Sequence, residues 1–101
     1  KIFNELDPKQ LKKIIDVYKN RNEKNIIILL SKNDNKVTTV VGVTEEISKK
    51  FSAVNIINHM IPILGGNGGG GRETLAQGGG NKIENATQAI SSAINYIKSE
   101  L

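Results

Sequence analysis

The sequence predicts a single α/β (α+β) domain: a small mixed sheet with an antiparallel hairpin, packed by three main helices, with a glycine-rich loop before the last helix. Two short β-branched runs separated by a turn cluster predict the hairpin. Apolar residues recur at helical spacing on both sides of these runs. A chain of 101 residues is long enough for one hydrophobic core and too short for two.

The first helix is expected to begin at Asp7. This residue can cap free amides, Pro8 suits the first turn, and Gln10 can complete a capping box. The apolar stripe behind this start follows helical spacing and comprises Leu11, Ile14, Ile15 and Tyr18. The helix should end within residues 20–25.

The first six residues are expected to end an upstream helical or linker region, so that the globular domain comprises residues 7–101. Residues 26–30 form a short, wholly apolar run, which predicts a central strand covered on both faces. Residues 33–35 form a turn cluster, and residues 37–43 predict the second strand of the hairpin.

Helical segments are expected on both sides of the glycines. Thr44 can cap a short segment that reaches Lys50, and Ser52 can cap a second helix that Pro62 kinks or ends. The buried side of that second helix should comprise Val54, Ile57, Ile61 and Leu64. Asn81 and Glu84 suggest a capping box for the last helix. Its apolar stripe comprises Ile83, Ala86, Ile90, Ala93, Ile94, Ile97 and Leu101.

Composition excludes several classes of function. The absence of cysteine excludes disulfides and thiolate metal sites, and His59 alone cannot build a histidine cluster. The apolar runs are too short to span a membrane and no signal peptide is visible, so a cytoplasmic location is expected. Because Met60 is the only methionine, the chain is expected to be part of a longer protein.

The formal net charge is +4, with the excess in the first part of the chain. Residues 1–60 carry 11 basic and 7 acidic side chains, whereas residues 61–101 carry three of each. This distribution fits weak, salt-sensitive attraction to a polyanion, although an ordinary lysine-rich surface would look the same. The lysines expected to supply diffuse attraction are Lys9, Lys12, Lys13, Lys49 and Lys50.

Nine of the sixteen residues from 65 to 80 are glycine. Such a block can be a mobile linker, a packing device for the last helix, or a cradle for an anion. The string Gly66-x-Gly68-x-x-Gly71 matches a dinucleotide fingerprint only weakly, because it follows an expected helix instead of a strand. An anion cradle would use backbone amides of the glycines, the donor fork of Arg72 and the side-chain amide of Gln77.

The block and its flanks resemble the C-terminal (DHHA1-type, C-Ala) domain of alanyl-tRNA synthetase. The family's glycine-rich run stands here as residues 65–80, and a similar segment stands as Ile47-Ser48-Lys49-Lys50-Phe51. Two departures from the family pattern are Asn67, where a lysine is usual, and one additional glycine before Arg72. The same glycine-rich module occurs beside DHH-type phosphodiesterases, but there it leads into a histidine.

The resemblance implies a non-catalytic domain that binds the elbow of tRNA-Ala and helps couple aminoacylation with editing. The ligase chemistry, with its ATP, Mg and Zn, would lie in other domains of the parent enzyme, and no cofactor is expected here. Upstream helices would contribute to a homodimer. The implied tRNA-binding residues are Gly68, Gly69, Gly70, Gly71, Arg72, Gln77, Lys49 and Lys50.

Two alternatives stay open from the sequence. A dimerisation or protein-interaction module of the same synthetase would need an exposed apolar patch, for which the candidates are Ile56, Ile57, Ile61 and Ile63. An accessory domain of a DHH-type phosphodiesterase is the other alternative. Metal-dependent hydrolysis needs clustered Asp and His ligands, and the three Asp of this chain all lie within its first 34 residues.

Overall fold

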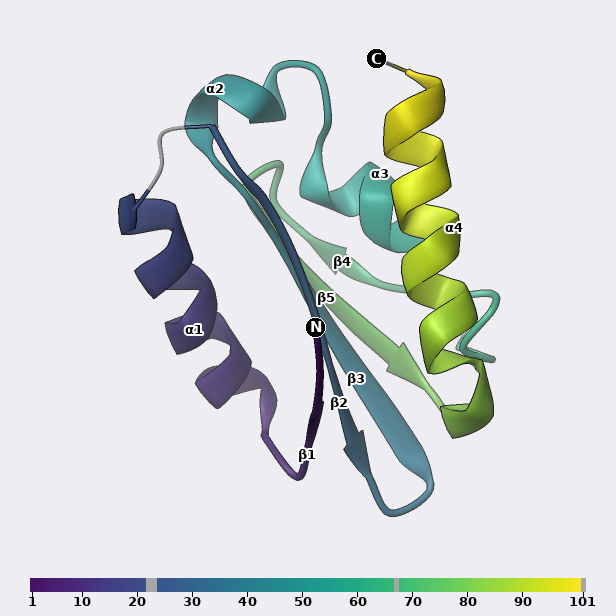
Figure 1. The fold of residues 1–101 in the computed structure, drawn as a ribbon. Helices are drawn as coiled ribbons and strands as arrows, with labels where there is room; N and C mark the ends of the chain where they lie inside the picture. Colours follow the sequence, from purple (N-terminus) through teal and green to yellow (C-terminus); the bar gives the residue numbers. More distant parts are fainter. Residues whose placement is uncertain (22–23, 67, 101) are drawn as a thin grey trace.

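The computed structural model describes residues 1–21, 24–66 and 68–100. Over these residues a five-stranded mixed sheet lies between two helical layers, with strand order β1-β2-β3-β5-β4 (Figure 1). Helix α1 covers one face, and helices α3 and α4 cover the other. The predicted fold class is therefore confirmed. In chain order the elements are β1 Ile2–Asn4, α1 Pro8–Arg21, β2 Ile26–Asn33, β3 Lys36–Val43, α2 Glu45–Ser48, α3 Ala53–Asn58, β4 Gly70–Gly71, β5 Leu75–Gly80, a 3-10 turn Ile83–Asn85 and α4 Ala86–Ser99.

The first residues of the chain contribute an edge strand. Strand β1 pairs in parallel with β2, in a register that places Ile2 opposite Leu30. The following residues are also tied to β2, because the amide of Leu6 donates to Ser31 Oγ at 2.8 Å. Residues 1–6, expected to end an upstream region, thus pack as part of this sheet.

Helix α1 begins as the sequence predicts. The Gln10 amide donates to Asp7 Oδ1 at 2.8 Å, and the Asp7 amide donates to Gln10 Oε1 at 2.9 Å. Both bonds of the expected capping box are therefore present. Leu11 and Ile15 are fully buried, but Tyr18 is exposed, so the predicted stripe is too long at its end. The Tyr18 ring instead lies 5.7 Å from the Arg21 guanidinium.

The hairpin of β2 and β3 is confirmed, with a two-residue turn between Asn33 and Lys36. Asp34 adopts a positive φ of 50°, which aspartate tolerates better than most side chains. Strand β3 is the middle strand of the sheet, and β2 lies between it and β1. Apolar residues cover β2 on both faces, as predicted for a wholly apolar run.

The sheet separates two hydrophobic clusters. The smaller one packs α1 against the sheet and contains Leu11, Ile15, Ile27, Leu29 and Val40. The larger one packs α3 and α4 against the opposite face and includes Leu30, Val41, Phe51, Met60 and Ala93. Because β2 and β3 supply both clusters, the two helical layers are joined through the hairpin.

Helix α3 is capped by Ser52, whose Oγ accepts from the Asn55 amide at 3.1 Å. The helix ends at Asn58, before Pro62, so the expected extent past Ile61 is too long. Thr44 precedes α2, but its side chain makes no capping hydrogen bond, so the predicted side-chain cap is wrong. Its Oγ1 instead accepts from the amide of Asn25 at 2.9 Å, so it ties α2 to the start of β2.

The apolar patch proposed for a dimer is largely internal. Ile56 and Ile57 are fully buried and Ile61 is 2% exposed, all within the larger cluster. Ile63 is partly buried against the same cluster. These isoleucines therefore form core and offer no exposed dimer surface.

The last helix differs from its prediction at its start. It is preceded by a 3-10 turn, and the Asn81 side chain caps neither element within the described chain. Asn85 Nδ2 instead donates to the Ile63 carbonyl at 2.9 Å. On the apolar stripe Ala86 and Ala93 are buried, whereas Ile94 is 40% exposed. Leu101, the last member of the expected stripe, lies outside the described residues.

The glycine-rich segment is only partly a loop. Gly70–Gly71 form the short edge strand β4, and residues 75–80 form β5. Glycines 78–80 pair with residues 37–39 of β3. The predicted β-capable piece around Leu75 is confirmed, but glycines expected to lie in a loop take part in the sheet.

No helix among the described residues has the length and apolarity needed to cross a membrane.

Candidate nucleic-acid interface

Most glycines of the block are required by packing. At seven of the nine, a Cβ would lie within 3.0 Å of another heavy atom: Gly65, Gly66, Gly69, Gly71, Gly78, Gly79 and Gly80. The shortest distances are for a Cβ at Gly66, which would lie 2.0 Å from the Gly79 carbonyl oxygen, and for a Cβ at Gly80, which would lie 2.0 Å from the Leu64 carbonyl oxygen. Two stretches of backbone thus lie nearly in contact beside β5. The packing interpretation of these glycines is therefore supported, and that of a free linker is not.

Gly68 and Gly70 are exceptions. A Cβ at either position would meet no described atom within 4 Å. Both residues are exposed, and Gly70 pairs with Gln77 across β4 and β5. Their lack of a side chain leaves open surface beside the backbone, which is what close approach of a ligand to backbone requires.

Gly70 belongs to a hollow that we call the cationic hollow, of about 190 Å³. Its lining residues are Lys12, Gly70, Gly71, Arg72, Leu75, Ala76 and Gln77. Lys12 comes from α1, while the others come from the β4–β5 hairpin. Four of the residues predicted to bind RNA therefore lie together, joined by a lysine from the facing helix.

The polar groups of this hollow are free to bind a ligand. Within the described chain, the side chains of Lys12, Arg72 and Gln77 have no hydrogen-bond or ion-pair partner. No described carboxylate lines the hollow. Two cations and one amide beside bare glycine backbone are complementary to a phosphate group and an adjacent polar edge.

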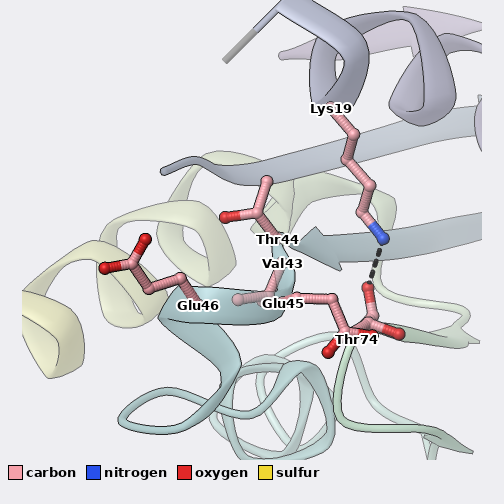
Figure 2. A pocket seen from close by; sticks show the side chains of 6 residues that line it. All are labelled: Lys19, Val43, Thr44, Glu45, Glu46 and Thr74. Atoms are coloured by element: carbon pink, nitrogen blue, oxygen red, sulfur yellow. Dashed lines mark hydrogen bonds between the residues drawn. The ribbon is translucent and has the colours of Figure 1, made fainter. Parts of the chain in front are cut away.

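A second lysine of α1 has a structural role. Lys19 reaches across to the β4–β5 turn and donates from Nζ to the Thr74 carbonyl at 2.8 Å (Figure 2). Burial lowers the pKa of Lys19; Arg72 lowers that pKa further, while Asp16 and Glu45 raise it. Lys19 therefore holds the turn that follows Arg72 against α1.

Figure 2 shows the hollow beside this tether, which is lined in part by Lys19, Glu45 and Glu46. Its volume is about 440 Å³. The two carboxylates come from the first turn of α2. Negative charge there makes this larger hollow a poor site for phosphate. The smaller cationic hollow has the charge that a nucleic acid needs.

The remaining predicted residues lie elsewhere. Lys49 and Lys50 follow α2, are exposed, and do not line the cationic hollow. The Lys50 ammonium lies 5.6 Å from the centre of the Phe51 ring. Gly68 and Gly69 precede β4 and are not among the lining residues. Asn67, the first departure from the family pattern, falls outside the described residues.

The single histidine of the chain, His59, packs against α4. His59 ends α3, is exposed, and stacks on Tyr96 with ring centroids 4.0 Å apart. Its Nδ1 lies 2.8 Å from the Asn55 carbonyl oxygen. The described residues contain no group of three or more His, Cys, Asp or Glu that could hold a metal ion.

Lys12 was predicted only to supply diffuse attraction, and Lys19 was assigned no role. A signal for both was available. They are seven residues apart, and both are partly buried beside the stripe of Leu11 and Ile15. Residues at this spacing share one side of a helix, so they were candidates to face one edge of the sheet.

These features belong to a known class of domain. The family model of the DHHA1 domain matches residues 1–99, so the chain belongs to the DHHA1 domain family. The predicted resemblance is thereby confirmed. Its fold is similar to the crystal structure of the C-Ala domain from Aquifex aeolicus alanyl-tRNA synthetase, with a TM-score of 0.83 and 34% sequence identity. The match covers 90% of this chain and 81% of that one.

Curated relatives are alanine–tRNA ligases. The ligase of Ruegeria sp. is 38% identical over 90 residues, which is 89% of this chain and 10% of the relative. That of Haemophilus influenzae is 38% identical over 96 residues, 95% of this chain and 11% of the relative. The chain thus spans about a tenth of the length of these relatives.

Proposed function

We propose that the chain is the tRNA-binding C-terminal domain of an alanine–tRNA ligase. The observation that carries the proposal is the cationic hollow, in which Lys12 and Arg72 are both unpaired within the described chain. Arg72 offers a planar fork that can bind one phosphate through two donors, and Lys12 adds a mobile point charge. Gly70 allows the RNA backbone to come close to the strand.

The partner is tRNA-Ala, contacted at its elbow through the sugar–phosphate backbone. In the parent enzyme this contact helps one tRNA reach both the aminoacylation and the editing sites. The parent enzyme is cytoplasmic. Its ligase chemistry, with ATP, Mg and Zn, resides in other domains. Gly68, Gly69, Lys49 and Lys50 are proposed as contacts or attracting charges outside the hollow. Dimer contacts are proposed to lie upstream, since the isoleucines that could form an apolar surface here are largely buried.

A salt titration of RNA binding tests this function. The chain is titrated with a tRNA-Ala transcript, and the logarithm of the affinity is followed against the logarithm of salt concentration. The variant Lys12→Ala/Arg72→Ala should bind more weakly and reduce the slope by about 1–2 units. Each phosphate contact releases bound counterions, so losing contacts lowers the number of counterions released. Lys98→Ala, an exposed lysine on α4, is the matched control. Equal slopes for the wild type and the double variant would exclude the cationic hollow as the RNA site.

A further inference from the structure

The amide of Gln77 occupies a position that phosphate binding does not explain. Gln77 lies in the middle of β5 and pairs with Val40 of β3. Opposite residues in a sheet share a face, and Val40 packs beneath α1, so Gln77 projects toward the α1 side. Its side chain is exposed and has no hydrogen-bond partner among the described residues. A polar head on a fixed strand therefore faces open space.

A second hollow begins on the other side of Gln77, and we call it the glycine hollow. Its volume is about 470 Å³, and its lining includes Pro8, Lys36 and Thr38 besides glycines 78–80. Gln77 lines both this hollow and the cationic hollow. No carboxylate of the described chain lines either one.

The two hollows differ in chemistry. The cationic hollow has two positive side chains, whereas the glycine hollow has a backbone floor with a single lysine, Lys36, that is exposed. Glycines 78–80 present only backbone to the glycine hollow, because packed atoms of Ile61, Val37 and Leu64 lie where their Cβ atoms would be. This uncharged peptide surface can make dispersion contacts with the flat face of a ring. A nucleotide has one flat ring and one phosphate joined by a sugar. Adjoining hollows that meet at one residue fit these two parts.

Gln77 stands where the edge of that ring would lie. A glutamine amide presents a donor next to an acceptor, and this pair matches the N6 and N7 atoms of adenine. In RNA such contacts are made to bases that are unpaired and splayed out. We propose that Gln77 reads an unpaired adenine placed in the glycine hollow while the neighbouring phosphate occupies the cationic hollow. This inference rests on the proposed function, because it assumes that the same surface binds RNA.

The test uses short oligouridine strands that carry a single central A, G, C or U, titrated against the chain at low salt. Gln77→Leu keeps the size of the side chain and removes its hydrogen-bonding groups. Gln88→Leu makes the same change at an exposed position of α4 and is the matched control. The readout is the ratio of Kd between the uridine strand and the adenine strand for each protein.

The wild type and Gln88→Leu should both favour the adenine strand by about tenfold, and Gln77→Leu should lose this preference, with a ratio near one. Salt-dependent binding without preference for adenine, or a preference that Gln77→Leu retains, would overturn the role of Gln77 and leave the proposed function intact. If the wild type bound none of the strands and no tRNA-Ala transcript, both the role of Gln77 and the proposed function would be overturned.

Discussion

Replacing glycines by alanine separates the two roles of the glycine block. At Gly80 a Cβ would lie 2.0 Å from the Leu64 carbonyl oxygen and 2.6 Å from its carbon. Both atoms are backbone, so relief requires movement of the turn after α3. We expect Gly80→Ala to lower the free energy of unfolding by about 3 kcal/mol, at the upper end for overpacking. For a domain of this size the melting temperature should fall by about 12–24 °C.

Gly70→Ala should behave in the opposite way. No described atom lies within 4 Å of its Cβ position, so the methyl group fits. Alanine is favoured over glycine in a strand by about 0.5–1 kcal/mol, and the variant should be at least as stable as the wild type. The methyl group would instead keep RNA away from the strand and raise the Kd for a tRNA-Ala transcript about tenfold.

Urea unfolding and RNA titration are measured on the same preparations, with Gly68→Ala as the stability control for a second open position. Equal stability of Gly80→Ala and the wild type would refute the close-approach argument. A destabilised Gly70→Ala would show that this glycine also serves packing.

Three further predictions concern the framework. Asp7→Ala removes the capping bond to the Gln10 amide and should lower the free energy of unfolding by about 1 kcal/mol in urea titration; an unchanged value would exclude a capping role. Ile57→Ala should lower it by about 2–5 kcal/mol, because Ile57 is fully buried, and sedimentation should show no change in association. Burial lowers the pKa of Lys19 in the folded chain. Between that lowered pKa and 10.5, the unfolded chain therefore binds more protons than the folded chain. The stability advantage of the wild type over Lys19→Met should therefore increase as the pH rises from neutral toward 10.5, and a shrinking advantage would contradict the sign.

Local signals in the sequence were sufficient to predict the start of α1, the β2–β3 hairpin and the start of α3. The capping box of Asp7 and Gln10, the hairpin and the Ser52 cap all involve residues close in sequence, and all are present. The misassigned cap at Thr44 shows the limit. Its hydroxyl is bound by the amide of Asn25, nineteen residues away, and no local pattern specifies that partner.

The strand character of the glycines was also hidden. Glycine has poor strand propensity, so glycines 78–80 predict a loop, yet they pair with β3. At each of them a Cβ would lie within 2.5 Å of an atom of Ile61, Val37 or Leu64, so a side chain is excluded by contacts far away in the sequence. The cationic hollow could be predicted in part. Arg72 and Gln77 follow from the motif, whereas the contribution of Lys12 depends on how α1 packs across the sheet.

We propose that RNA binds on the α1 side of the β4–β5 hairpin. Mapping amide chemical shifts of the isotope-labelled chain during titration with a tRNA-Ala transcript tests it most directly. The largest changes should fall on residues 70–77 and around Lys12, with the α4 face at Gln88 and Lys98 unaffected. Changes centred on α4, or spread evenly over all exposed lysines, would contradict the account.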